Sequence, residues 1–369
     1  MRLELPRWYD LHAHFRQGDI LPFLIRDHLA MGCAGILAMP NTKPPVAKVF
    51  RKDGLDCWSI EEYLSMLREA GGDEFEDIIV PLYLTQNTTA AMIEEGAKSG
   101  LLRACKYYPP HGTTGSEHGW HFASFLEKGI FAAMEEAGIV LCVHGEEHGM
   151  RPEDYFARKT NAEEHFYRER MPRLIGRHPK LRVVAEHVTT KVAADFVAQA
   201  GNAAATITPQ HLIYTAGHLV QGLKYHLYCM PLVKFEEDRQ ALRDAVLAPG
   251  NTTFFAGTDS APHTKKATPC GCAAGCYTGG IAPQLYAQAF EMAGADLGAK
   301  EAQKAFRQFL CLNGPAFYGL PVPDKTFILE KKEQPVTKLA TQAGDVIPLP
   351  LGMQADDPEK TVFLPWAIV

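Results

Sequence analysis

The sequence lacks any run of about 18 consecutive apolar residues, which excludes an obvious membrane-spanning helix. It also lacks a strong excess of either charge. With a net charge of −6 it offers no basic surface for nucleic acid or an anionic membrane, and we expect neither as a partner. Residues 1–7 carry charges and a proline instead of the apolar core of a secretion signal. The nine cysteines are odd in number and lie mostly in apolar segments, which favours reduced thiols and a cytoplasmic protein.

Short apolar segments alternate with helical ones along most of the chain. The predicted strands are residues 8–11, 34–39, 78–84, 101–106, 139–143, 182–186, 203–207 and 253–256. The predicted helices are residues 20–31, 60–70, 89–99, 119–137, 162–177 and 190–200. Eight strands with intervening helices predict an α/β fold, a closed (β/α)8 TIM-like barrel. A doubly wound open sheet is the alternative, but a Gly-x-Gly-x-x-Gly motif does not follow the first strand.

The pattern changes after Gly319. Prolines and short apolar runs at 327–329, 346–351 and 362–369 predict a small C-terminal appendage of irregular strands. We therefore expect a barrel domain over residues 1–320 and a C-terminal extension over residues 321–369 that packs on the barrel.

Residues that suit metal binding gather where the predicted strands end. His12 and His14 lie two positions apart, and side chains two apart on a strand face the same way, so both imidazoles can reach one point. Later strands end at further candidates, which are Lys106, His144, His187 and Asp259. The C-terminal strand ends of a barrel converge on one face, where active sites lie. The sequence therefore predicts a common site.

Each candidate also has an ordinary structural role when taken alone. A histidine after a strand is usually hydrogen-bonded in the core or a loop, a lysine there extends to water, and an aspartate commonly caps a helix. Their joint placement at five strand ends is what favours a site. Four imidazoles and a carboxylate suit Zn²⁺ or a similar divalent ion. The Lys106 ammonium is the exception, because it would repel a metal.

Taken together these residues resemble the amidohydrolase superfamily and, within it, the dihydroorotases of the shorter bacterial type. The resemblance runs from residue 10 to about residue 320, and the tail after it matches weakly. The segments that carry it are 10–16, 39–46, 106–109, 113–114, 143–146, 186–191, 205–211, 226–229, 257–263 and 270–272. Gln17 and residues 115–117 depart from the family pattern without removing a candidate ligand.

The resemblance implies a metal-dependent hydrolase of cyclic amide C–N bonds. Its reaction is the reversible cyclisation of N-carbamoyl-L-aspartate to dihydroorotate in pyrimidine biosynthesis. Two metal ions, normally Zn²⁺, are implied. His12, His14 and Asp259 would hold one ion, and His144 and His187 the other. Lys106 would be carboxylated at its Nζ atom and bridge the two ions. Asp259 would also be the catalytic group that moves a proton.

The resemblance also implies contacts with the substrate. Arg16 shares the alternation phase of the two histidines, and its planar fork suits a carboxylate. The family places Asn41 and His263 beside it. It assigns further substrate contacts to Thr113, Thr114 and Met230, with Ala273 or Ala274 near another. Residues 109–118, rich in Pro, Gly, Thr and Ser, are predicted to form a mobile loop that closes over the site.

Two other functions remain open. One is a hydantoinase-like hydrolase, which would share the metal ligands but lack the carboxylate set of Arg16, Asn41 and His263. The other is a catalytically inactive structural homologue, which would be expected to lose ligands. The cysteine run at 270, 272 and 276 is predicted to be a structural loop instead of a separate zinc site. Relatives are typically homodimers, so we expect a homodimer with only a small-molecule substrate as its other partner.

Overall fold

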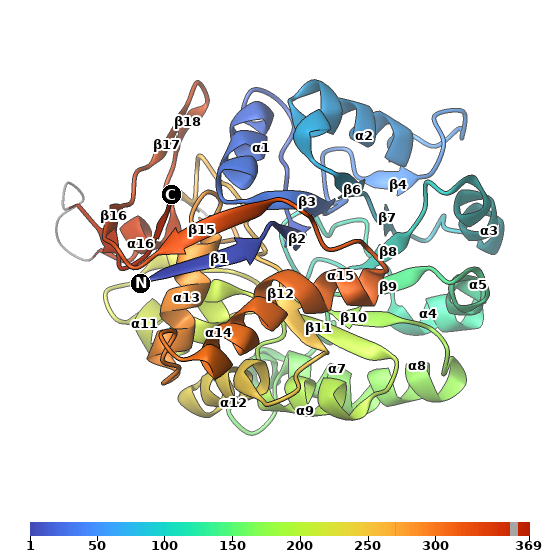
Figure 1. Cartoon of the computed structure of the whole chain (residues 1–369). Helices are drawn as coiled ribbons and strands as arrows, with labels where there is room; N and C mark the ends of the chain where they lie inside the picture. Colours follow the sequence, from blue (N-terminus) through green and yellow to red (C-terminus); the bar gives the residue numbers. More distant parts are fainter. Residues whose placement is uncertain (270, 355–360) are drawn as a thin grey trace.

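A ring of parallel strands forms the centre of the computed structural model, which describes residues 1–269, 271–354 and 361–369 (Figure 1). Its strands are β2 (Trp8–Ala13), β3 (Cys33–Ala38), β6 (Asp77–Ile79), β7 (Leu82–Tyr83), β8 (Ala104–Tyr107), β9 (Val140–Val143), β10 (Val183–Ala185), β11 (Ala203–Ile207) and β12 (Phe254–Ala256). They pair in the orders β2-β3-β6 and β7-β8-β9-β10-β11-β12. β6 and β7 occupy one predicted strand, which is interrupted at Pro81, a residue with no N–H for the ladder.

The ring closes between its first and last strands. The N–H group of Asp259, just after β12, donates to the carbonyl oxygen of His12 at 2.8 Å. Ala13 forms a parallel bridge with Ser260. Strands such as β3 and β9 are buried along their whole length, as expected for strands covered on both faces. The predicted (β/α)8 barrel is confirmed.

Helices surround the ring. Those that follow the first seven strand positions are α1 (Leu21–Ala30), α2 (Ile60–Glu69), α3 (Ala90–Ser99), α4 (Phe122–Glu127), α5 (Ile130–Ala137), α6 (Pro152–Tyr155), α7 (Ala162–Glu169), α8 (Met171–Arg177), α9 (Lys191–Gln199), α10 (Pro209–Ile213), α11 (Ala216–Val220) and α12 (Glu236–Leu247). Two predicted helices are each split in two. Gly129, with φ of +71°, separates α4 from α5, and Pro172 lies in the first turn of α8.

The chain after β12 closes the outer layer. Its helical segments are α13 (Ala282–Met292), α14 (Lys300–Arg307), η3 (Gln308–Leu312) and α15 (Asn313–Tyr318). Short elements in the loops are β4 (Val46–Lys48), β5 (Trp58–Ser59), η1 (Gly72–Glu74), η2 (Tyr225–Leu227), β13 (Ala267–Thr268) and β14 (Gly271–Cys272). Within the described ranges, none of the helices has the length and apolar character needed to cross a membrane.

The C-terminal segment pairs with the start of the chain. β15 (Thr326–Glu330) lies antiparallel between β1 (Arg2–Pro6) and β20 (Ala367–Ile368), and Figure 1 shows β1 and β15 side by side. β1 was not predicted from the sequence. Its alternation of exposed and buried residues is short, from Arg2 to Leu5, and ends at a proline. The division into domains at residue 320 stays a prediction.

The rest of this segment is made of short pieces. They are β16 (Gln334–Pro335), β17 (Leu339–Thr341), β18 (Gly344–Val346), α16 (Leu349–Gly352) and β19 (Phe363–Leu364). The expectation of a strand over 346–351 is wrong in its second half, because the helix α16 begins at Leu349 with Pro350 in its first turn. Residues 355–360 of the predicted extension lie outside the described residues.

Candidate metal centre and active site

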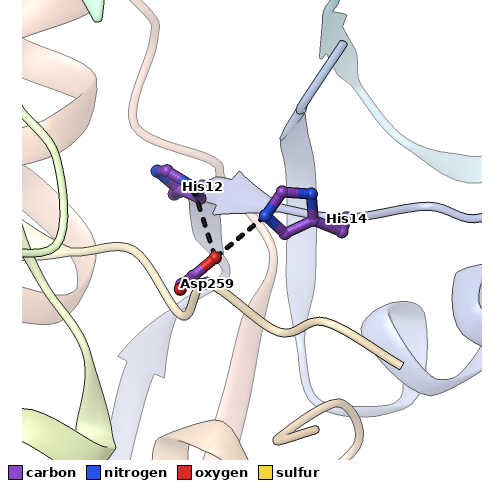
Figure 2. Close-up of side chains that lie close together, drawn as sticks. All are labelled: His12, His14 and Asp259. Carbon is purple, nitrogen blue, oxygen red and sulfur yellow. Dashed lines mark hydrogen bonds and ion pairs between the residues drawn. The ribbon is translucent and has the colours of Figure 1, made fainter. Parts of the chain in front are cut away.

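His12, His14 and Asp259 meet at the C-terminal end of the barrel strands (Figure 2). All three are buried, and one ligand atom of each lies within 4.8 Å of the others. The Oδ1 atom of Asp259 is 2.9 Å from Nε2 of His14 and 3.5 Å from Nε2 of His12. This group has the composition and size of a metal site.

The other ring nitrogens of these histidines already have partners. Nδ1 of His12 donates to Oε2 of Glu186 at 2.6 Å, and Nδ1 of His14 donates to Oδ1 of Asn41 at 2.8 Å. A neutral imidazole has one N–H, so each Nε2 atom presents a lone pair toward the Asp259 carboxylate. Lone pairs and a carboxylate oxygen repel one another unless a cation lies between them. The donor set therefore fits a metal ion.

The pKa values agree with this assignment of protons. Burial lowers the pKa of His14 to about 4, so its imidazole is neutral at pH 7. Burial alone would raise the pKa of Asp259. The close contact with His14, together with the nearby His12 and Lys106, outweighs burial and lowers that pKa to about 2. The carboxylate is therefore ionised at neutral pH.

His187 and His144 extend the group along the strand ends. The ring centroid of His187 is 4.9 Å from that of His12 and 4.7 Å from that of His144. Nε2 of His144 donates to Oε2 of Glu146 at 2.8 Å, which leaves its Nδ1 atom as a lone-pair donor. Burial lowers the pKa of both His187 and His144, so both side chains are neutral ligand types.

Lys106 points into the same space from the end of β8. Its side chain is completely buried, and its Nζ atom has no hydrogen-bond partner. A buried ammonium without a hydrogen-bond partner is costly, and burial accordingly lowers the pKa of Lys106, although Glu186 and Asp259 partly offset this effect. The neutral amine is the form of lysine that reacts as a nucleophile.

Two proposed ligands have an unusual backbone conformation. His187 has φ of +40° and Asp259 has φ of +48°, in the left-handed region that side chains disfavour. Hydrogen bonds hold both turns. The N–H of His187 donates to Thr206 Oγ1 at 2.7 Å. The N–H of Thr258, the residue before Asp259, donates to the Asp10 carboxylate at 3.0 Å.

The predicted substrate residues lie beside this group. A small cavity of about 10 Å³ is lined by His14, Arg16, Asn41, Thr113, Thr114, Met230, Asp259, Ala261, Ala274 and Gly275. His263 does not line it, but its Nε2 atom donates to the carbonyl oxygen of Ala274 at 2.9 Å. A larger cavity of about 540 Å³ lies beside α12 and α14, and none of the predicted site residues lines it.

Loop 109–118 forms one wall of this cavity through Thr113 and Thr114. Asn41 Nδ2 donates to the carbonyl oxygen of Thr114 at 2.9 Å. The hydroxyl of Thr114 donates to the carbonyl oxygen of Ala274 at 3.3 Å and accepts from its N–H group at 3.2 Å. These contacts join the loop to both sides of the site. The remaining volume is about that of a single water molecule. That loop 109–118 moves to admit a substrate stays a prediction.

Two glutamates that hydrogen-bond to His12 and His144 were not expected from the sequence. Glu186 directly precedes His187, and Glu146 follows His144 by two positions, so both lie in motifs already singled out. A carboxylate next to a candidate ligand was the available signal, because histidine ligands commonly donate their second N–H to a carboxylate.

The cysteine run is only partly described. Cys270 lies outside the described residues. The Sγ atoms of Cys272 and Cys276 contact different carbonyl oxygens, of Tyr225 at 3.5 Å and of His226 at 3.4 Å. The structural role expected of this run stays a prediction.

Comparisons with known proteins agree with this site. No protein-family model matches the chain. Over 357 residues, however, the chain is 42% identical to the dihydroorotase of Halorhodospira halophila, a match that covers 95% of this chain and 96% of that protein. The crystal structure of the Saccharomyces cerevisiae dihydroorotase in complex with 5-fluoroorotic acid superposes with a TM-score of 0.84 at 27% identity, and covers 100% of this chain and 98% of that one.

A hydantoinase is a more distant neighbour. The L-hydantoinase of Arthrobacter aurescens gives a TM-score of 0.71 at 16% identity, covering 99% of this chain and 82% of that one. That likeness is one of fold alone, whereas the match to dihydroorotases extends to sequence over nearly the whole chain. The barrel, the buried His-His-Asp group and this match together place the chain in the dihydroorotase family.

Proposed function

We propose that this chain catalyses the reversible cyclisation of N-carbamoyl-L-aspartate to dihydroorotate at the site formed by the barrel strand ends. One observation carries the proposal. The lone pairs of His12 and His14, the carboxylate of Asp259 and the unpartnered Lys106 amine converge in one buried space. Facing lone pairs and a carboxylate are stabilised by bound cations. The reaction proposed is that of the dihydroorotase family, to which the chain belongs.

We further propose two Zn²⁺ or similar divalent ions. His12, His14 and Asp259 would hold one, His144 and His187 the other, and Lys106 carboxylated at Nζ would bridge them. Burial lowers the pKa of Lys106 and so favours its neutral amine, which supports this assignment. Reaction with CO₂ would turn a nitrogen without a hydrogen-bond partner into an anionic oxygen ligand. Glu186 and Glu146 would orient the imidazoles of His12 and His144 through their outer nitrogens.

The chemistry divides between the metals and the protein. When bound, divalent ions polarise the amide carbonyl and make a water molecule nucleophilic near neutral pH. In the hydrolytic direction, a carboxylate oxygen of Asp259 would take the proton of that water and pass it to the departing ring nitrogen. The ionised state of Asp259 supports the first half of this role. Cyclisation uses the same steps in reverse.

Arg16 would bind the carboxylate of the substrate. Within the described part of the chain its guanidinium has no carboxylate partner, and its best hydrogen bond, to the carbonyl oxygen of Asn41, is long at 3.5 Å. Its donors are thus available for an incoming anion. A simple hydantoin lacks that carboxylate, so Arg16 favours a dihydroorotase over a hydantoinase. Asn41, His263, Met230 and the two threonines of loop 109–118 would complete the enclosure.

We also propose a cytoplasmic homodimer. The eight described cysteines are all free, which suits a reducing compartment. Val220, the last residue of α11, and Leu223, just after it, are 74% and 73% exposed, and such apolar side chains support self-association. Sedimentation equilibrium of the purified protein tests the dimer.

The function is tested by metal analysis combined with assays in both directions. We expect about two divalent ions per chain, hydrolysis of dihydroorotate, cyclisation of carbamoyl-aspartate, and little turnover of an unsubstituted hydantoin. Hydantoin turnover above that of dihydroorotate would favour the hydantoinase-like alternative. A fully metallated protein without either activity would favour the inactive homologue.

Lys106→Ala tests the bridging role. We expect this variant to lose most bound metal and nearly all activity, whereas Lys265→Ala, which removes an exposed lysine, keeps both. Unchanged metal content and rate in Lys106→Ala would exclude Lys106 from the centre. Isotope-labelled CO₂ incorporated into the wild type and absent from the variant would identify the carboxylated amine.

A further inference from the structure

Lys266 is a buried cation that the proposed function does not use. Its side chain is 6% exposed, and its Nζ atom donates to three backbone carbonyl oxygens. The distances to the oxygens of Tyr228 and Ala273 are both 2.6 Å, and the third acceptor is Gly275. An ammonium has three N–H groups, so each has an acceptor. Among the described residues no carboxylate forms an ion pair with Lys266.

The three acceptors belong to two segments that reach the cavity of the active site. One segment contains Tyr228 and Met230, and the other contains Ala273, Ala274 and Gly275. Met230, Ala274 and Gly275 line the cavity. The N–H of Gly275 also donates to the carbonyl oxygen of Tyr228 at 3.0 Å. Lys266 therefore joins these two segments immediately behind the surface that faces the substrate.

The ammonium also fixes which way one peptide group points. A trans peptide is planar, with its C=O and N–H on opposite sides. Because the carbonyl of Ala273 points to Lys266, the N–H of Ala274 points away from it. That N–H reaches Thr114 Oγ1 at 3.2 Å, at the edge of the cavity that Arg16 also lines. Without Lys266, three carbonyl oxygens would face one another with no donor between them.

We propose that Lys266 is a positioning residue for recognition of the substrate carboxylate. It acts through the Ala273–Ala274 peptide, whose N–H it turns to the cavity side, where it donates to Thr114 Oγ1 beside the expected place of the anion. Rotation of that peptide would turn a carbonyl oxygen toward the anion, which repels it. The unneutralised charge of Lys266 adds a second, longer-range attraction for a carboxylate. This inference rests on the proposed function, since it assumes that the substrate carries a carboxylate near Arg16.

The test compares Lys266→Met, Lys266→Gln and Lys266→Arg with Lys265→Met. The control removes an exposed positive charge one residue away in the same loop. Metal content, thermal unfolding, and KM and kcat for dihydroorotate and carbamoyl-aspartate are measured for each variant. We expect Lys266→Met to raise KM about tenfold or more, as for the loss of a hydrogen bond to a charged group, with metal content retained and kcat changed much less. Lys266→Arg should recover part of the loss, because it restores the charge and several donors.

Several results would overturn the proposal. One is a KM for Lys266→Met equal to that of Lys265→Met. A second is a fall in kcat and metal content together at unchanged KM. A third is failure of both Lys266→Met and Lys266→Gln to fold, which would give Lys266 a purely structural role. Wild-type protein that turns over neither substrate would instead refute the proposed function, so the two failures are distinguishable.

Discussion

The Nδ1 atom of His12 lies 2.6 Å from the Oε2 atom of Glu186, and both side chains are fully buried. Thr206 Oγ1 donates to the same oxygen at 2.6 Å, so Glu186 is itself held in place. This contact determines which nitrogen of His12 carries the proton and which faces the proposed metal. The imidazole of His12 is thus oriented by groups of the protein itself.

Glu186→Gln is expected to weaken metal binding without removing a ligand. The amide is a poorer acceptor than the carboxylate, so the ring of His12 is less firmly oriented and less basic, with an expected cost of roughly 10–100-fold in metal affinity or activity. Competition with a chelator measures the affinity. Glu135→Gln is the control, because Glu135 also pairs with a histidine, His178, but outside the site. Equal metal affinities in the two variants would contradict the orienting role.

Asp259→Asn is expected to preserve the fold and to lower the rate by at least the roughly 10²–10⁴-fold typical of a group that transfers a proton. The loss of a charged ligand adds to this cost. Steady-state kinetics with saturating added Zn²⁺ separates the two effects, because excess metal restores occupancy but not proton transfer. A loss of less than tenfold under those conditions would mean that another residue moves the proton.

Arg16→Met is expected to weaken substrate binding far more than metal binding. Loss of a charge-assisted contact with the substrate carboxylate should cost roughly 1.5–3 kcal/mol in kcat/KM. Arg26→Met, which removes an exposed arginine, is the matched control and should behave as wild type. If Arg16→Met keeps the wild-type KM and kcat/KM, the substrate carboxylate binds elsewhere.

The double variant Thr113→Ala with Thr114→Ala tests loop 109–118 as a lid. It removes the hydroxyl that bonds Ala274, so we expect kcat/KM to fall by one to several orders of magnitude with both metals retained. Thr252→Ala, an exposed threonine that lines the distant cavity beside α14, should have no effect. Full activity of the double variant, or loss of metal from it, would show that the loop does not act on the substrate.

The barrel could be predicted from the sequence because its strands are short apolar runs with chemical groups at their ends. His12, His144 and His187 all follow such runs, and parallel strands bring their ends to one face. The division of two predicted helices into shorter ones was harder to see in the sequence. Gly129 and Pro172 each interrupt a continuous apolar pattern, and only backbone geometry shows where one helix stops.

Other features depend on contacts between distant segments and left no local signal. Lys266 is one lysine among many in the sequence, and only the folded chain brings three carbonyl oxygens to its Nζ atom. His263 was expected beside Arg16, and only the fold shows that its Nε2–H donates to the carbonyl oxygen of Ala274. Its contact with the substrate stays a prediction. The left-handed conformations of His187 and Asp259 are likewise set by neighbouring strands and not by residue type.

The pairing of β1 with β15 constrains the order in which the molecule can be assembled. Arg2 lies opposite Glu330 and Pro6 opposite Thr326, so partners are separated by more than three hundred residues of chain. During synthesis the first strand leaves the ribosome long before its partner exists. Until residues 326–330 have been made, β1 lacks this strand partner, and its edge is open to other chains. This sheet can therefore form only late in synthesis, and a shortened chain that lacks β15 would keep that edge exposed.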